Sequence, residues 1–178
     1  AELALNEMDF ELNGDFNYKD SLKNMKLNYK AKNLDIESVL SLLPEKHKAR
    51  INDYKSTGEF FANGNLDYSA TRPFSINSKF GINGATIEYI PKNTKLTNVV
   101  VAGELHINKD KTSLDLSDIK ATLNGENFSG KFFMENFNDP FIDVTSNGTF
   151  NLQNVYAFWP IDTLQKLEGV LKIDGRVK

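Results

Sequence analysis

Strict alternation of apolar and polar residues is the feature that most constrains the fold of this chain of 178 residues. Such a period of two puts successive side chains on opposite faces of a strand, one dry and one wet. Parallel strands buried on both faces read instead as continuous apolar runs. The pattern therefore predicts antiparallel strands with one apolar face. It is clearest at the even positions Phe60, Ala62, Leu66, Tyr68, Phe74, Ile76, Phe80 and Ile82.

The same alternation recurs along most of the chain, for example in residues 25–31, 99–107, 128–134 and 171–177. On this basis the sequence predicts ten to twelve strands. A further turn is expected at residues 109–111. Five Asn-Gly pairs add turn signals, because Asn-Gly tolerates the positive φ of a tight hairpin. We expect several of them to reverse the chain, and those within a continuing register to form bulges. The pairs are Asn13-Gly14, Asn63-Gly64, Asn83-Gly84, Asn124-Gly125 and Asn147-Gly148.

Two short segments follow a helical period instead, and each stops at a proline. The expected fold is therefore mainly β: a long antiparallel curled sheet, open like a taco shell, with two short amphipathic helical segments. The helical positions are Ile36, Val39, Leu40 and Leu43 before Pro44, and Leu152, Val155, Tyr156 and Trp159 before Pro160.

These two helical segments superpose when the sequence is shifted by 116 residues, and the strand motifs around them superpose at a shift of 111. The difference falls in loops, where insertions are tolerated. We therefore predict an internal repeat, with a first unit over residues 1–118 and a partial second copy over residues 119–178. Because the sequence begins without Met and ends inside an expected strand, we interpret the chain as a fragment of a longer protein.

Composition excludes several classes of function. The net charge is −3, and no Lys/Arg cluster marks a phosphate-backbone contact, so no nucleic-acid partner is expected. The absence of cysteine excludes disulfides and thiolate metal sites. No apolar run approaches the roughly 20 residues that a membrane-spanning helix needs.

Side chains able to support catalysis are few or scattered. The two histidines, His47 and His106, have no Ser and carboxylate beside them in the pattern of a catalytic triad. The carboxylate pairs Asp115/Asp118 and Glu135/Asp139 could be considered for glycoside hydrolysis, but alternating strands naturally place Asp and Glu outward. We expect no enzymatic activity, no metal site and no cofactor.

The aromatic residues lie mainly on the apolar register. Such a stripe is usually the core of a closed sandwich. The other interpretation is an open groove, in which one curled sheet leaves its apolar floor accessible to acyl chains. For that groove we predict the lining residues Phe60, Leu66, Tyr68, Phe74, Ile76, Phe80, Ile82, Ile87, Val99, Val101, Leu105, Phe128, Phe132 and Met134.

Several loose motifs resemble the C-terminal region of the bacterial AsmA-like proteins, a family of envelope proteins with a repeating β-groove. Together they cover most of the chain, although none is a signature on its own. The matching stretches are residues 71–76 leading to 80–87, then 123–125, 128–132, 136–144, 148–152 and 167–175.

The resemblance implies a periplasmic protein tethered to the inner membrane by a helix outside this fragment. It also implies a groove that holds or conducts phospholipid acyl chains between the inner and outer membranes, a role in outer-membrane biogenesis, and no catalytic residues. Other envelope proteins are potential partners. The alternative function is that of a closed β-sandwich acting as a scaffold or adhesion module of a cell-envelope complex.

Overall fold

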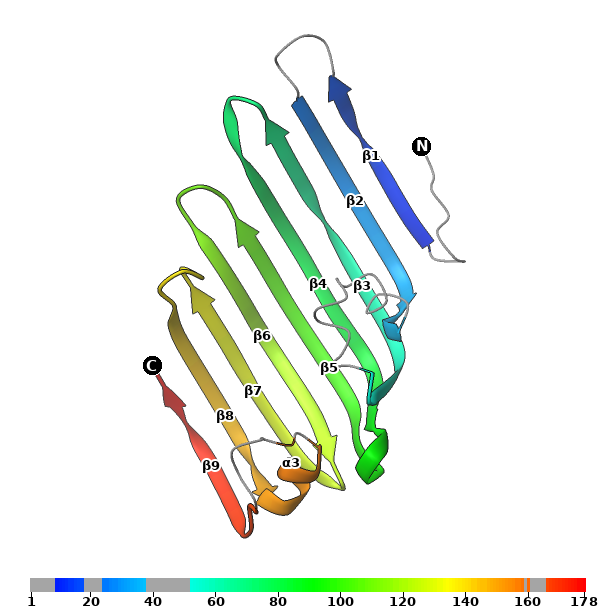
Figure 1. Cartoon of the computed structure of the whole chain (residues 1–178), viewed down its shortest axis with the longest axis vertical. Coiled ribbons are helices and arrows are strands. Elements are labelled where there is room, and N and C mark those ends of the chain that lie inside the picture. Colours follow the sequence, from blue (N-terminus) through cyan, green and yellow to red (C-terminus); the bar gives the residue numbers. More distant parts are fainter. Residues whose placement is uncertain (1–8, 18–23, 38–51, 159, 161–165) are drawn as a thin grey trace.

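The computed structural model describes residues 9–17, 24–37, 52–158, 160 and 166–178. These residues form one antiparallel sheet of nine strands, in which every strand pairs with its neighbours in the sequence (Figure 1). The strands are β1 (Asp9–Asn17), β2 (Asn24–Asp35), β3 (Tyr54–Ser69), β4 (Arg72–Tyr89), β5 (Thr94–Ile107), β6 (Thr112–Leu123), β7 (Glu126–Glu135), β8 (Phe141–Asn151) and β9 (Val170–Val177).

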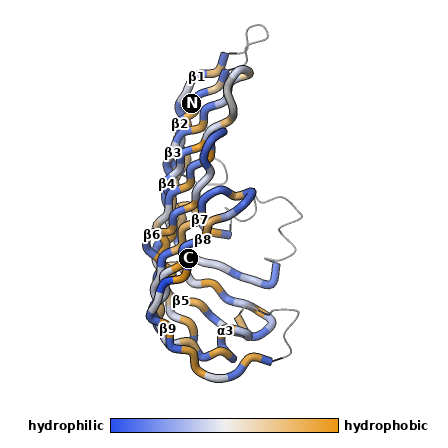
Figure 2. The backbone as a smooth tube through the Cα atoms, turned by 90° about the vertical axis from the view of Figure 1, so that its left-hand side faces the viewer, coloured by the Kyte–Doolittle hydropathy of each residue, from blue (hydrophilic) through white to orange (hydrophobic). Residues whose placement is uncertain are grey.

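The sheet is open and does not close into a barrel. Seen edge on, it is a thin, twisted layer with alternating hydropathy along its strands (Figure 2). No second sheet covers it among the residues that the structure describes. The mainly β antiparallel fold expected from the alternation is confirmed, and the closed sandwich is not the architecture of this part of the chain.

The described residues form nine strands, compared with the ten to twelve predicted for the whole chain, and most Asn-Gly pairs do not turn the chain. Asn13-Gly14, Asn63-Gly64 and Asn147-Gly148 lie inside continuous strands, and only Asn124-Gly125 reverses the chain, between β6 and β7. Asn124 and Gly125 have φ values of 47° and 89°, as a type I′ turn requires. Asn83-Gly84 accompanies a register shift in β4, where Gly84 has a φ of 63°.

The turn expected at residues 109–111 is confirmed. The amide of Asn108 donates to the carbonyl of Lys111 at 2.9 Å, and the side-chain oxygen of Asn108 accepts from the amides of Asp110 and Lys111. This turn joins β5 to β6 at the same end of the strands as the turns between β3 and β4 and between β7 and β8. We call this end of the sheet the hairpin end.

The second predicted helix is present as α3 (Leu152–Phe158), and its last predicted position, Trp159, lies outside the described residues. It begins where it does because the side-chain oxygen of Asn151 accepts from the amides of Gln153 and Asn154, at 3.0 and 3.4 Å. Pro160 follows its end. A 3₁₀ turn, η1 (Ile90–Lys92), joins β4 to β5. The first predicted helix begins at Ile36 and Glu37, but its remaining positions, residues 38–44, lie outside the described residues.

Both helical connections leave the sheet at the same end, opposite the hairpin end, because β2 and β8 run in the same direction. We call this the helix end. The placement is the one that an internal repeat would give, whereas the division into units at residues 1–118 and 119–178 stays a prediction.

The small core lies toward the helix end of the apolar face. Ile36 packs there with three small or medium residues, Ala85, Val99 and Ala121, and a second cluster joins Ala31, Leu34 and Ala62. Among the described residues, no large side chain is fully buried. The sheet thus has a modest core at one end and leaves most of its large apolar side chains partly in solvent.

Candidate functional site: the apolar face of the sheet

All fourteen predicted lining residues lie on one face of the sheet. Directly paired residues of neighbouring strands point to the same face. Phe60 pairs with Ile82 and Ile82 with Val101, while Ile76 pairs with both Leu66 and Ile107. The other predicted residues join the same face through the registers of β2 to β8. We call this surface the apolar face. Its placement follows from the register, and lipid binding by these residues remains a prediction.

The sequence analysis missed other members of the apolar face. On β6 the register shifts between Leu116 and Ile119, so apolar positions change from even to odd along that strand. Even-numbered positions therefore mark the apolar face only up to the bulge, although alternation holds on either side of it. The sequence of β1 also alternates, but its apolar residues were not among the predicted lining residues. The residues added by the structure include Phe10, Leu12, Phe16, Leu114, Leu116, Ile119, Phe150 and Leu171.

Aromatic rings on this face lie across glycines of neighbouring strands. A Cβ atom placed on Gly103 would lie 2.8 Å from the ring of Phe80 and 2.8 Å from Leu116. A Cβ atom on Gly64 would lie 2.9 Å from the hydroxyl of Tyr29. These glycines therefore let the aromatic side chains pack against the backbone of the next strand. As a result, the side chains protrude less from the apolar face.

Exposure increases toward the hairpin end. Tyr68 and Phe74, on either side of the β3–β4 turn, are 42% and 41% exposed, and Phe16 near the end of β1 is 67% exposed. Phe60 and Phe80, in the middle of the sheet, are half-buried and stack with ring centroids 6.4 Å apart. On β1 to β4 the apolar face is therefore more exposed at the hairpin end, whereas on the outer strand β9 Leu171 is also 45% exposed at the helix end.

The helix α3 is held over the helix end of this face by Tyr54. The Tyr54 hydroxyl donates to the carbonyl oxygen of Phe158 at 2.8 Å, and the two rings meet edge to face at 5.6 Å. Tyr54 also contacts the ring of Tyr89 at 4.9 Å. Burial raises the pKa of the Tyr54 hydroxyl above its ordinary value, and the neighbouring Tyr89 and Asp53 add to the rise. The hydroxyl therefore stays a donor at neutral pH.

The opposite face is polar, and its charges pair across strands. Lys79 lies 2.9 Å from Glu104, Lys95 lies 3.3 Å from Glu88, and Lys111 lies 3.1 Å from Glu135. The hydrogen bond from Lys79, its positive charge and the hydrogen bond from His106 hold the pKa of Glu104 below its ordinary value. We call this surface the polar face. Exposed pairs of this kind add little stability, but they keep this side of the sheet in water.

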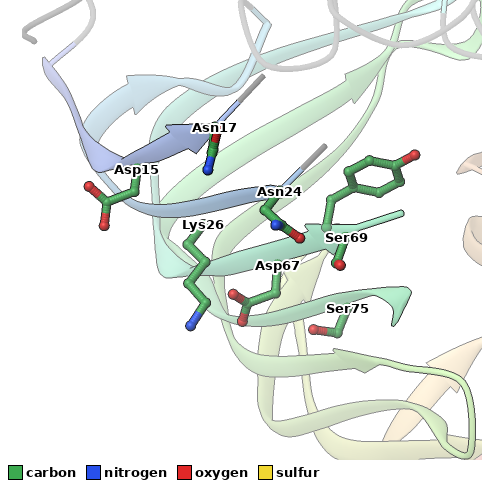
Figure 3. Close-up of a pocket in the computed structure, with 8 residues that line it drawn as sticks. Asp15, Asn17, Asn24, Lys26, Asp67, Ser69 and Ser75 are labelled. Atoms are coloured by element: carbon green, nitrogen blue, oxygen red, sulfur yellow. The ribbon is translucent and has the colours of Figure 1, made fainter. Parts of the chain in front are cut away.

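A pocket of about 350 Å³ lies at the hairpin end of β1 to β4 (Figure 3). Asp15, Lys26 and Asp67 project from the same side of the sheet in this pocket. Its lining mixes both charge signs with amides and hydroxyls, which suits water and ions better than an acyl chain. The lining residues are Asp15, Asn17, Asn24, Lys26, Asp67, Tyr68, Ser69 and Ser75.

Three of the four carboxylates considered for catalysis lie in an ion pair or in a turn. Asp118 pairs with Lys120 at 3.0 Å on the polar face, and Glu135 pairs with Lys111. Asp139 sits in the β7–β8 turn, where its amide donates to the carbonyl of Asn136. Within the described ranges no three His, Asp or Glu side chains gather as metal ligands. His47 lies outside those ranges, and His106 lies on the polar face beside Asn77.

Comparison with protein-family models, with curated proteins and with solved structures finds no match for this chain. None of the helices that the structure describes is long and apolar enough to cross a membrane.

Proposed function

We propose that the apolar face binds the acyl chains of phospholipids. On this proposal the chain is a lipid-handling segment of an AsmA-like periplasmic protein, which passes phospholipid between the inner and outer membranes. The protein would be tethered to the inner membrane outside this segment. The observation that carries the proposal is a broad apolar sheet face whose large side chains are left partly exposed by the described residues.

The size of the apolar face supports this proposal. Soluble monomers rarely expose apolar patches of more than a few hundred Å², and larger ones usually bind a partner, a membrane or a ligand. Here apolar side chains form a row across the strands, with Ala62 and Phe80 on one side of Gly103 and Leu116, Phe132 and Val144 on the other. Such a row runs across the strands and offers an extended contact to a hydrocarbon chain.

The energetics are sufficient for reversible binding. Each methylene moved fully from water to an apolar surface contributes about 0.8 kcal/mol. A chain of about 14 methylenes that is covered on one side only would gain roughly half of the full value, or about 6 kcal/mol. The polar headgroup would remain in water. Phe80 and Tyr29 pack against Gly103 and Gly64, where no side chain interrupts the apolar face, and this favours sliding.

Adjacent valines on β5 give a matched test. Val101 pairs with Ile82 and Ile119 on the apolar face, whereas Val100 pairs with Lys120 on the polar face, and both are half-buried. Val101→Asp places a charge under the bound chain, so we expect at least about a tenfold loss of affinity for a fluorescent fatty acid. Val100→Asp should bind like the unaltered protein.

A second matched pair protects the test against loss of folding. Phe74 is exposed on the apolar face and Ser75 follows it on the polar face, so Phe74→Asp and Ser75→Asp should both keep the sheet. Circular dichroism checks folding, and native mass spectrometry of protein isolated with phospholipid checks binding. The proposal is wrong if no lipid is retained, or if both members of each pair bind equally.

A further inference from the structure

A band of β-bulges crosses the sheet between its middle and the helix end, and we call it the bulge band. In this band β2, β4, β5 and β6 each contain one residue more than the stretch of the neighbouring strand with which they pair. On β4, for example, Ile82 and Ala85 pair with Val101 and Val99, so three steps along β4 match two along β5. By contrast, β7, β8 and β9 pair with one another in continuous register.

At each bulge two successive residues interrupt the alternation, and all of them are polar or glycine. The apolar residues on either side of each pair lie on the apolar face, so each pair adds a residue on the polar side. Asn33, Gly84 and Asn98 are exposed and have φ values of 52°, 63° and 52°, in the left-handed region that Gly and Asn tolerate best. The four pairs are Lys32-Asn33, Asn83-Gly84, Thr97-Asn98 and Ser117-Asp118.

The side on which the extra residues lie gives the direction of the bend. A bulge bends the strand that carries it, and bulges at defined positions in several strands curve a sheet. In the bulge band each extra residue lengthens the polar side of its strand, while the apolar residues before and after it stay on the same face. The bends of the four strands therefore add in one direction, with the apolar face on the inside.

Small buried side chains on the apolar side of the bulge band agree with this direction. Ala31, Ala62, Ala85 and Ala121 are all buried, and Ala85 is 0% exposed. A Cβ atom on Gly58 of β3 would lie 2.6 Å from the Cα atom of Ala85, so β3 and β4 approach each other closely there. The inside of a bend has less room than the outside. The alanines thus support a bend toward the apolar face independently of the register.

We propose that the four bulges bend the sheet into a trough and that an acyl chain lies in this trough, across β2 to β6. The placement of the acyl chain rests on the proposed function, whereas the bend does not. Ile36 and the core around it fill the helix side of the trough, so the acyl chain would lie beside them, against Phe60, Phe80 and Val101. The bulge residues are then positioning residues, which act on lipid binding through the curvature of the floor.

Deletion of Asn98 tests this role, because it removes the extra residue and restores strict alternation. Leu96, Val99 and Val101 then occupy every second position, so β5 keeps its apolar residues on the apolar face. Deletion of Asn33 does the same on β2. A flatter floor covers less of a bound chain, and each methylene that loses its contact weakens binding by about fourfold. We therefore expect each deletion to lower the affinity for a fluorescent fatty acid by about fourfold or more.

Spin labels measure the bend without lipid. The chain has no cysteine, so Ala70→Cys at the β3–β4 turn and Gln153→Cys on α3 provide two exposed label sites at opposite ends of the sheet. The distance between the labels, measured by pulsed electron paramagnetic resonance, should lengthen in both deletion variants as the sheet flattens. Asn98→Gly is the control, because glycine keeps the left-handed conformation, and it should change neither the distance nor the affinity.

The two measurements separate the possible failures, once circular dichroism has shown that the variants are folded. An unchanged label distance in both deletion variants would overturn the bend. A longer distance with undiminished affinity would overturn the positioning role of the bulges. If the unaltered chain binds no fatty acid, the proposed function fails together with the placement of the acyl chain, and the label distances still decide the bend.

A nitroxide-labelled stearic acid locates the acyl chain in the unaltered protein, so this test does not depend on the folding of any variant. Paramagnetic broadening of amide signals should be greatest along the row from Phe80 through Gly103 to Leu116, and weaker at Phe74 near the β3–β4 turn. The greatest broadening at Phe74 would overturn the placement of the acyl chain in the trough.

Discussion

At the scale of single residues, the contact between Phe80 and Gly103 shapes the floor of the apolar face. The ring needs the space that a side chain at position 103 would occupy. Interior strand glycines usually weaken a sheet, so their presence here indicates a requirement for close approach. We infer that Gly103 allows the Phe80 ring to add apolar surface while staying close to the sheet.

Gly103→Val should therefore destabilise the protein. A Cβ atom at this position would lie 2.8 Å from both Phe80 and Leu116 and 3.0 Å from the backbone oxygen of Asp115. Overpacking of this kind costs about 1–3 kcal/mol. The matched control is Gly175→Val on β9, where nothing lies within 4 Å of the added atom. Urea denaturation should show the loss for the first variant and a change within about 0.5 kcal/mol for the second.

The pair of Asp143 and Arg176 joins the polar sides of β8 and β9. The hydrogen bond from Arg176 holds the pKa of the Asp143 carboxyl below its ordinary value of 3.8. Because the folded pKa is the lower one, the pair favours folding above pH 3.8, and this contribution is lost as the pH falls through the folded pKa. The Arg176 side chain is 58% exposed, although that of Asp143 is only 12% exposed, so solvent screens the pair from one side and we expect the effect on stability to be small.

Arg176→Gln removes the charged donor, and we expect the pKa of Asp143 to rise toward its ordinary value. Carboxyl chemical shifts followed by NMR through an acid titration measure this directly. Lys131→Gln, which removes a cation elsewhere on the polar face, is the comparison and should leave the pKa of Asp143 unchanged. An unchanged pKa in Arg176→Gln would mean that the ion pair does not form in solution.

At the scale of elements, α3 depends on its contact with β3. Tyr54→Phe removes the hydrogen bond to the Phe158 carbonyl and keeps the ring contact. The loss of such a bond costs about 0.5–1.5 kcal/mol. Hydrogen exchange of the α3 amides should therefore accelerate, while the amides of β5 and β6 keep their protection. Tyr68→Phe at the hairpin end is the control. Faster hydrogen exchange of the α3 amides in that variant would contradict this role of Tyr54.

The elements also show how far sequence reasoning reaches. Alternation predicts the strands and the two faces because burial on one side of a strand requires a period of two. It fails across the bulge between Leu116 and Ile119, where one face passes from even to odd positions. Asn-Gly predicts a turn from local φ preference alone, yet Asn63-Gly64 and Asn147-Gly148 lie within β3 and β8. There the pairing with neighbouring strands outweighs the local preference.

The helix α3 was predictable because its apolar spacing and the following proline are both local in sequence. The contact of Tyr54 with Phe158 joins residues 104 positions apart, so no local pattern could reveal it. Similarly, whether the aromatic stripe is covered by a second layer depends on the whole topology. For that reason the sequence left the open groove and the closed sandwich as alternatives.

At the scale of the whole molecule, the two faces of the sheet differ in polarity. The polar face is covered with paired charges such as Lys79 and Glu104, which keep that side in water. The apolar face holds a modest core near α3 and leaves larger side chains toward the hairpin end partly exposed. A sheet of this kind needs something apolar to cover it, and we infer that hydrocarbon from membrane lipid does so.

Site-specific photocross-linking tests that inference most directly. A photoreactive amino acid at Leu105 would sit on the apolar face, whereas the same group at His106, one residue further along β5, would sit on the polar face. After expression in a bacterial envelope and irradiation, we predict a phospholipid adduct at position 105 and none at position 106. Equal labelling at both positions, or a protein adduct in place of lipid at position 105, would contradict the account.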